Sequence, residues 1–167
     1  MKGQLILLST IVLLFISCSN EEVNSEGPTT SHSVPLGHFR GISIGDAMDV
    51  VLKREPIDSV VFSIPNQVMY NIGTDTCVLQ VSYEFEEDTL HTIQADWFFL
   101  EEVDLEQMAE EIRTSFDNKY ARQEGQGDFE VWKSVNAEGE MVEFTMMDAS
   151  TEYGRPVLSL TIYDSHQ

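Results

Sequence analysis

The sequence predicts an α+β fold in which two helices cover one face of an antiparallel sheet. The first observation is a set of segments in which apolar and polar residues alternate with a period of two. The clearest of them is 79–86, where the apolar positions are Leu79, Val81, Tyr83 and Phe85. The second is a pair of segments with apolar residues at helical spacing. Because half-buried alternating strands pack one side on the core, we expect the other face of the sheet to be open.

Local sequence signals set the expected ends of both helices. Ser43, with Asp46 three residues later, is expected to cap the first helix, and Pro56 to stop it. Asp104, with Gln107 as its capping-box partner, is expected to open the second. The predicted apolar face of this second helix consists of Leu105, Met108, Ala109, Ile112 and Phe116.

The strands fall into two groups of three. The first group comprises a region of strand composition at 60–72 and the alternating segments 79–86 and 92–100, with a turn at Glu87-Asp88. The second comprises 129–134, 141–147 and 157–163. The chain is therefore predicted to hold two pseudo-repeated helix–β–β–β units, at 36–100 and 101–167. The two units have almost no identical residues at corresponding positions. The predicted repeat therefore lies in the order of helix and strands and not in the amino-acid sequence.

The first 35 residues predict export and a lipid anchor. Lys2 precedes an apolar run at 5–16, whose helical length of about 18 Å is shorter than the hydrocarbon core of about 30 Å. A charged start, a short apolar run and small residues before a cysteine are typical of a secretory signal. The end of the run, Phe15-Ile16-Ser17-Cys18, resembles the lipobox of Bacteroidetes lipoproteins. We therefore expect a signal peptide at 1–17, lipid on Cys18, a polar tether at 18–35, and attachment to the bacterial outer membrane.

Charge and cysteine content exclude several classes of protein. The chain has 29 acidic and 9 basic residues, a formal net charge of −20. Such a surface repels phosphate groups, so we expect no nucleic-acid binding and no electrostatic docking on anionic membranes. Cys77 is the only cysteine besides Cys18, so we expect no disulfide within the chain and a buried thiol at position 77.

Catalytic and metal sites are not indicated by the sequence. Residues 41–45 (Gly-Ile-Ser-Ile-Gly) match the G-x-S-x-G nucleophile elbow. No buried strand leads into the motif, and we interpret Ser43 as a helix cap instead. The four histidines are scattered without the convergence that a zinc site needs. We expect no catalytic residue, no metal and no cofactor.

Two stretches carry a resemblance to known families. The helix start at 41–46 (Gly-Ile-Ser-Ile-Gly-Asp), followed by a meander with Tyr-Glu-Phe at 83–85, resembles small outer-membrane-assembly lipoproteins of the SmpA/OmlA type. A tandem pair of such units is similar to the fold of the beta-lactamase inhibitor protein. The resemblance covers roughly 36–164 and is poorer over 101–167, where the glycine-rich helix start is missing. It implies a binding or scaffolding domain and transfers no catalytic residue.

The open face of the second unit is the predicted partner-binding surface. Aromatic residues and methionine among polar residues on a flat face are typical of protein recognition. The predicted residues are Trp132, Glu143, Thr145, Met147, Thr161 and Tyr163. A one-residue shift of register would instead place Trp132 in the core, and the sequence leaves both arrangements open.

The expected function follows from the anchor and this surface. We expect a lipid-anchored envelope lipoprotein that acts as a non-catalytic protein-binding or scaffolding module for an unknown protein partner. Two alternatives stay open: an inhibitor of a secreted hydrolase, and a small-molecule binder or enzyme with a pocket between the two units.

Overall fold

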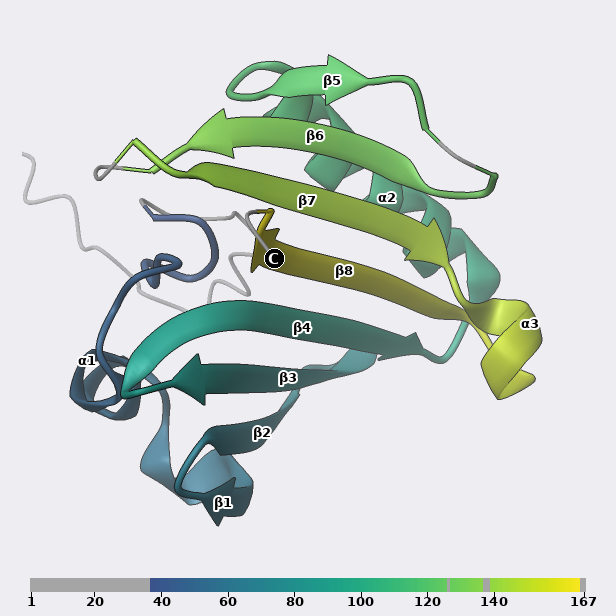
Figure 1. Ribbon diagram of the computed structural model, residues 1–167. Coiled ribbons are helices and arrows are strands. Elements are labelled where there is room, and N and C mark those ends of the chain that lie inside the picture. The colour runs from purple at the N-terminus through teal and green to yellow at the C-terminus, as the bar shows by residue number, and fades with distance from the viewer. Residues whose placement is uncertain (1–36, 126, 137–138, 166–167) are drawn as a thin grey trace, which may run out of the picture.

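A single antiparallel sheet of eight strands organises the molecule (Figure 1). The computed structural model describes residues 37–125, 127–136 and 139–165, so the predicted signal peptide, Cys18 and tether lie outside the described residues. The strands are β1 (Val60–Ile64), β2 (Gln67–Gly73), β3 (Cys77–Glu86), β4 (Thr89–Phe99), β5 (Ala121–Gln123), β6 (Glu130–Val135), β7 (Met141–Asp148) and β8 (Val157–Asp164). Their order across the sheet is β1-β2-β3-β4-β8-β7-β6-β5. The α+β class and the antiparallel sheet are confirmed.

The helices differ in length and in place. They are α1 (Met48–Arg54), the 3-10 turn η1 (Ile57–Ser59), α2 (Glu102–Asp117) and α3 (Ser150–Tyr153). Helix α2 lies along one face of the sheet, behind β6, β7 and β8 in Figure 1. Its five predicted apolar residues are all buried, so this amphipathic face is confirmed. Helix α3 is a short turn in the connection from β7 to β8.

Both predicted helix starts are wrong. Helix α1 begins at Met48, because the Asp46 carboxylate accepts a hydrogen bond from the Ser43 backbone N–H (2.8 Å) and closes a turn ahead of the helix. Helix α2 begins at Glu102 and has no side-chain cap. In α2, packing of the five buried apolar residues on the sheet sets where the helix forms.

Each half of the chain contributes four strands, so the predicted three per half are wrong. A tight connection at 65–66 divides the predicted first strand region into the hairpin β1–β2. The fully exposed β5 has three residues and no apolar alternation to signal it. The turn at Glu87-Asp88 is confirmed, and both residues have positive φ (49° and 70°), the backbone that matches a two-residue hairpin.

The two halves share one sheet and one core. The last strand of each half, β4 and β8, pair with each other in the middle of the sheet over Thr92–Phe98 and Val157–Tyr163. The core lies on the face of the sheet that α2 covers in part, and Phe39, Ile42, Ile44 and Val51 from the N-terminal segment belong to it as well. Residues 37–165 therefore hold the whole described core, and a chain that begins at residue 19 retains all of it.

Candidate functional site

The face of the sheet opposite α2, which we call the open face, is the candidate site. Residues paired across antiparallel strands point to the same side, so the register identifies its members. On the three central strands they are Thr92, Gln94 and Asp96 of β4, Ser159, Thr161 and Tyr163 of β8, and Glu143, Thr145 and Met147 of β7. This face is turned toward the viewer in Figure 1, and α3 is the helix that lies at its end.

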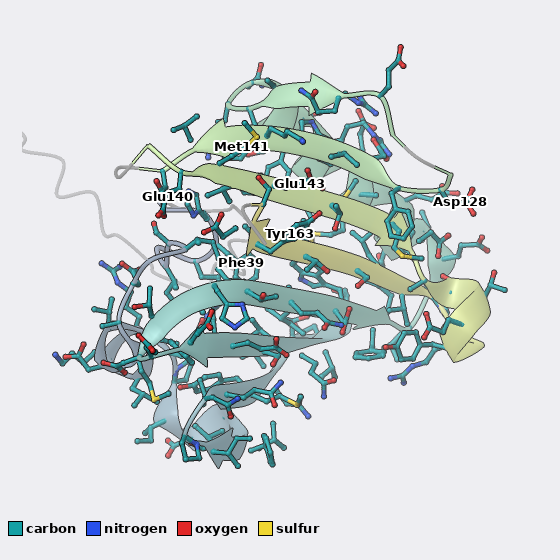
Figure 2. All side chains as sticks on the ribbon, viewed as in Figure 1. Phe39, Asp128, Glu140, Met141, Glu143 and Tyr163 are labelled. Atoms are coloured by element: carbon teal, nitrogen blue, oxygen red, sulfur yellow. The ribbon has the colours of Figure 1, made fainter. Side chains whose placement is uncertain are left out.

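Five of the six predicted surface residues lie on the open face. Glu143, Thr145, Met147, Thr161 and Tyr163 are all half-buried. Figure 2 shows Glu143 and Tyr163 next to each other in front of β7 and β8. The alternation of apolar and polar residues in β7 and β8 was sufficient to assign these five side chains to the open face.

Trp132 is not part of this face, and its predicted exposure is wrong. Its side chain is fully buried, and it pairs with Phe144 of β7 on the core side. The ring packs edge-on against Phe116 of α2, with 5.3 Å between centroids. Its Nε1–H donates to the Asp117 carboxylate at 2.7 Å. Trp132 therefore holds the C-terminal end of α2 on the sheet.

The misplacement of Trp132 has a physical cause in β6. Glu130 has the same parity as Trp132, and a carboxylate on that side is typical of a solvent-facing row. The structure neutralises Glu130 instead, with Arg113 (2.7 Å) and Arg122 (2.5 Å) at the rim of the core. Arg113 holds the pKa of Glu130 below its usual range.

A hydrogen-bonded cluster of three side chains, Lys133, Glu143 and Tyr163, forms one end of the open face. The Lys133 ammonium lies 3.0 Å from the Glu143 carboxylate. The Tyr163 hydroxyl donates a short hydrogen bond to the other oxygen of the same carboxylate. The cluster joins β6, β7 and β8, so its members hold one another in fixed positions.

The cluster alters the acid–base properties of its members. Burial, followed by the hydrogen bond to Glu143, raises the pKa of Tyr163 to about 12. Burial alone would raise the pKa of Glu143, but the hydrogen bonds from Tyr163 and Lys133 and the lysine charge outweigh it and lower this pKa. At neutral pH Tyr163 is therefore a protonated donor, and Glu143 is a carboxylate with both oxygens engaged.

Two neighbouring hollows meet at this cluster. One, of about 680 Å³, reaches from the cluster toward His91 and Thr92 of β4. The other, of about 720 Å³, reaches toward Phe129 and Val131 beside β5. The three cluster residues line both hollows. The first hollow therefore lies across the β4–β8 junction, where the two halves of the chain meet.

A second polar group occupies the other end of the open face. Asp96 is buried and accepts hydrogen bonds from the Ser159 hydroxyl (2.5 Å) and the Gln94 amide (3.0 Å). Burial raises its pKa above the usual range of an aspartate. Beside it, Tyr153 of α3 packs edge-on against Phe98, with 5.4 Å between centroids. Helix α3 thus closes this end of the face.

The G-x-S-x-G motif does not form a nucleophile elbow. Phe39 and Ile42 form an isolated bridge around a tight turn, and the motif continues from this turn toward α1. The nearest described histidine, His38, accepts a hydrogen bond from the Ile44 N–H at 3.0 Å. Asp164 and His166 follow Ser43 in the chain order of a hydrolase triad, and His166 lies outside the described residues. Within the described ranges there is no group of three or more His, Cys, Asp or Glu side chains that could hold a metal ion.

One buried ion pair was not anticipated from the sequence. The Glu55 side chain is 1% exposed, and its carboxylate accepts from the Arg40 guanidinium at 2.9 Å and from the Tyr83 hydroxyl. Burial and the Glu55 charge raise the pKa of Tyr83. The three residues come from three separate segments, so no local pattern reveals them. They fix α1 and the preceding turn onto β3, on the core side of the sheet.

Cys77 is a buried free thiol, as predicted. Its sulfur lies 3.3 Å from the Thr74 hydroxyl, within the turn that leads into β3. Among the described helices there is none whose length and apolar character would allow it to cross a membrane.

Comparisons of the chain with protein-family models, with curated proteins and with solved structures give no match. The resemblance to SmpA/OmlA-type lipoproteins therefore stays a prediction.

Proposed function

We propose that this chain is a lipid-anchored lipoprotein of the bacterial outer membrane whose folded domain is a non-catalytic protein-binding module. The observation that carries the proposal is the open face. No helix among the described residues covers its middle strands, and they present a row of half-buried polar side chains with Met147 among them. Lipid on Cys18 would hold the domain at the membrane, and residues 18–35 would separate the two.

The Lys133–Glu143–Tyr163 cluster at one end of the open face supports binding rather than catalysis. Both oxygens of Glu143 are already engaged, so this carboxylate is a poor candidate for a general base. Rigid donors and acceptors on a sheet favour recognition, because their side chains are already ordered and lose little conformational entropy when a partner binds. The net charge of −20 favours a partner with a basic surface.

The two halves of the chain are further proposed to be pseudo-repeated units. The support is their arrangement: each half supplies a helix and a four-stranded meander, and the final strands β4 and β8 pair side by side. A two-unit binding domain of this kind is what the resemblance to the beta-lactamase inhibitor protein implies. A secreted hydrolase is therefore one class of partner to test.

The first experiment is co-purification from envelope extracts with the chain from residue 19 onward. Thr161→Arg places a long cation in the middle of the open face, whereas Thr114→Arg places the same group on the exposed outside of α2. We expect a partner that is retained by the wild type and the Thr114 variant and lost by the Thr161 variant. Equal retention by both variants would contradict the proposal.

The anchor is tested separately on intact cells. With the wild-type chain, we expect the protein to fractionate with the outer membrane, and with Cys18→Ala we expect it to leave that fraction. Proteinase added to the cells then shows on which side of the outer membrane the domain lies. Degradation in intact cells places the domain outside, and protection until the outer membrane is opened places it in the periplasm. A Cys18→Ala chain that stays in the membrane would refute lipid anchoring at this cysteine.

The hollow across the β4–β8 junction favours one alternative, the binding of a small polar molecule. Its lining offers a cation, a carboxylate and a hydroxyl from Lys133, Glu143 and Tyr163. A thermal-unfolding screen of small metabolites distinguishes the two functions. A ligand at a hundred times its dissociation constant stabilises the folded state by about 2.7 kcal/mol. If a metabolite stabilises the wild-type chain by about this amount and does not stabilise Tyr163→Phe, the small-molecule function would be favoured.

A further inference from the structure

The two edges of the sheet are built differently. The edge strand β5 has three residues, and its Arg122 forms ion pairs with Asp117 (3.2 Å) and Glu130 (2.5 Å). The edge strand β1 has five residues, none of them charged, and all are exposed. Short, charged edges discourage pairing with another sheet, whereas uncharged apolar edges invite it. Within the part of the chain that the structure describes, the β5 edge is therefore protected against pairing and the β1 edge is not.

A group of exposed apolar residues lies in β1 and in the segment that leads to it. The exposed large apolar residues between positions 52 and 64, each 37–79% exposed, are Leu52, Ile57, Val60, Val61, Phe62 and Ile64. Single exposed apolar residues need no explanation, but a contiguous group of them marks an interaction surface. β1 forms the far end of the sheet from β5 and β6, at the bottom of Figure 1. Within the described residues no strand pairs with its outer side.

We propose that two copies of this chain associate edge to edge, with β1 of one copy antiparallel to β1 of the other. Charge favours a second copy at this edge. The chain carries a net charge of −20, yet residues 50–73 hold only Lys53, Arg54, Glu55 and Asp58, which sum to zero. Contact through any strongly acidic surface would be opposed by repulsion, which extends about 10 Å at 0.1 M salt. This edge lets two copies meet while their acidic regions stay apart.

The sequence of β1 is compatible with pairing to itself. A two-fold axis at Phe62 would place Val60 opposite Ile64, Val61 opposite Ser63, and Phe62 opposite its own counterpart. Apolar and aromatic cross-strand pairs stabilise antiparallel strands, and this register contains no pair of like charges. The resulting contact would join the two sheets and leave the open faces of both copies free.

Two features limit the strength of this contact. The register between β1 and β2 shifts between Val60 and Phe62, so β1 is bulged at its first half. Pro65 follows the strand directly and has no N–H to extend the pairing. The contact is therefore smaller than a standard interface, and we expect a weak dimer with a dissociation constant of roughly 10–100 µM.

Sedimentation over a range of concentrations tests the proposal, with the chain from residue 19 onward. Val61→Lys adds a charge to the exposed edge, and Val135→Lys adds the same charge at an exposed position on β6. We expect wild type and the Val135 variant to dimerise with rising concentration, and the Val61 variant to sediment as a monomer up to about ten times the wild-type dissociation constant. A wild-type chain that is monomeric at about 500 µM would overturn the proposal, as would equal behaviour of the two variants.

Amide hydrogen exchange on the wild-type chain gives a second readout that needs no variant. If β1 pairs with its counterpart, exchange at residues 60–64 slows as concentration rises, while exchange in β5 does not change. A dimer in which β1 exchange is independent of concentration would use another surface and would also overturn the proposal.

Discussion

Replacement of Trp132 by alanine tests the assignment that separates the core from the open face. The indole is fully buried between β6 and α2, against Phe116 and Phe144. A buried tryptophan removes about 200 Å² from water, which corresponds to about 5 kcal/mol at 25 cal/mol per Å². Truncations of buried aromatic residues cost about 3–5 kcal/mol. The bond to Asp117 adds little, because that carboxylate side chain is 40% exposed and water can replace the indole N–H.

We therefore expect Trp132→Ala to lower the free energy of unfolding by about 4 kcal/mol. Trp132→Phe keeps most of the apolar contact but leaves part of the indole's space unfilled, so its expected cost is about 1–2 kcal/mol. Val135→Ala, at an exposed position on the same strand, is the control and should stay within about 0.5 kcal/mol of wild type.

Urea unfolding followed by far-UV circular dichroism measures these differences. The signal comes from the backbone, so removing one of the two tryptophans leaves it interpretable. The urea dependence of the unfolding free energy should be unchanged in all variants, so the whole effect should lie in the midpoint. A cost below about 1 kcal/mol for Trp132→Ala would refute the buried position of this residue, because surface substitutions have effects of that size.

Three further predictions concern ionisable groups. Arg40→Met should cost about 3 kcal/mol in urea unfolding, because it leaves the buried Glu55 carboxylate without its cation; a cost near zero would contradict that pairing. The pKa of Asp96 is raised on folding, so its contribution to stability is complete at low pH and is lost as pH rises through the folded-state pKa. Asp96→Asn should therefore gain stability relative to wild type between about pH 3 and pH 7 in unfolding experiments, and a difference that does not change with pH would count against this. Tyr163→Phe should raise the pKa of Glu143, measured by NMR titration of its side-chain carboxyl carbon, and an unchanged pKa would show that the hydrogen bond has no effect.

The periodic segments were the part of the fold that the sequence could predict. Strands β7 and β8 alternate cleanly, and their predicted bounds, 141–147 and 157–163, differ from the structure by one residue each. All five residues predicted for the apolar face of α2 are buried. These patterns are read from residues close in sequence, and burial on one side enforces them.

Tertiary contacts account for what the sequence did not reveal. A carboxylate such as Glu130 is typical of a solvent-facing row, but Arg113 and Arg122, which lie outside β6, neutralise it at the rim of the core. A short exposed strand such as β5 has no pattern to detect. The predictions of the two helix starts relied on local capping residues, and neither helix has a side-chain cap in the structure.

The same distinction applies to the candidate site. Five of its predicted residues could be placed from alternation alone. The bond between Glu143 and Tyr163, and the approach of Lys133, depend on how β6, β7 and β8 align in the sheet. The sequence of one strand does not determine its register against a strand that is distant in the chain. The hydrogen-bonded cluster could therefore not be predicted from the sequence.

Site-specific photo-crosslinking in cells tests the central claim most directly. A photoreactive residue placed at Thr145 or Thr161 would report contacts of the open face, and one placed at Thr114 would report the outside of α2. We expect one adduct of defined mass from both open-face positions and none of that mass from position 114. Adducts that form equally from all three positions, or from position 114 alone, would contradict the assignment of the open face as the binding surface.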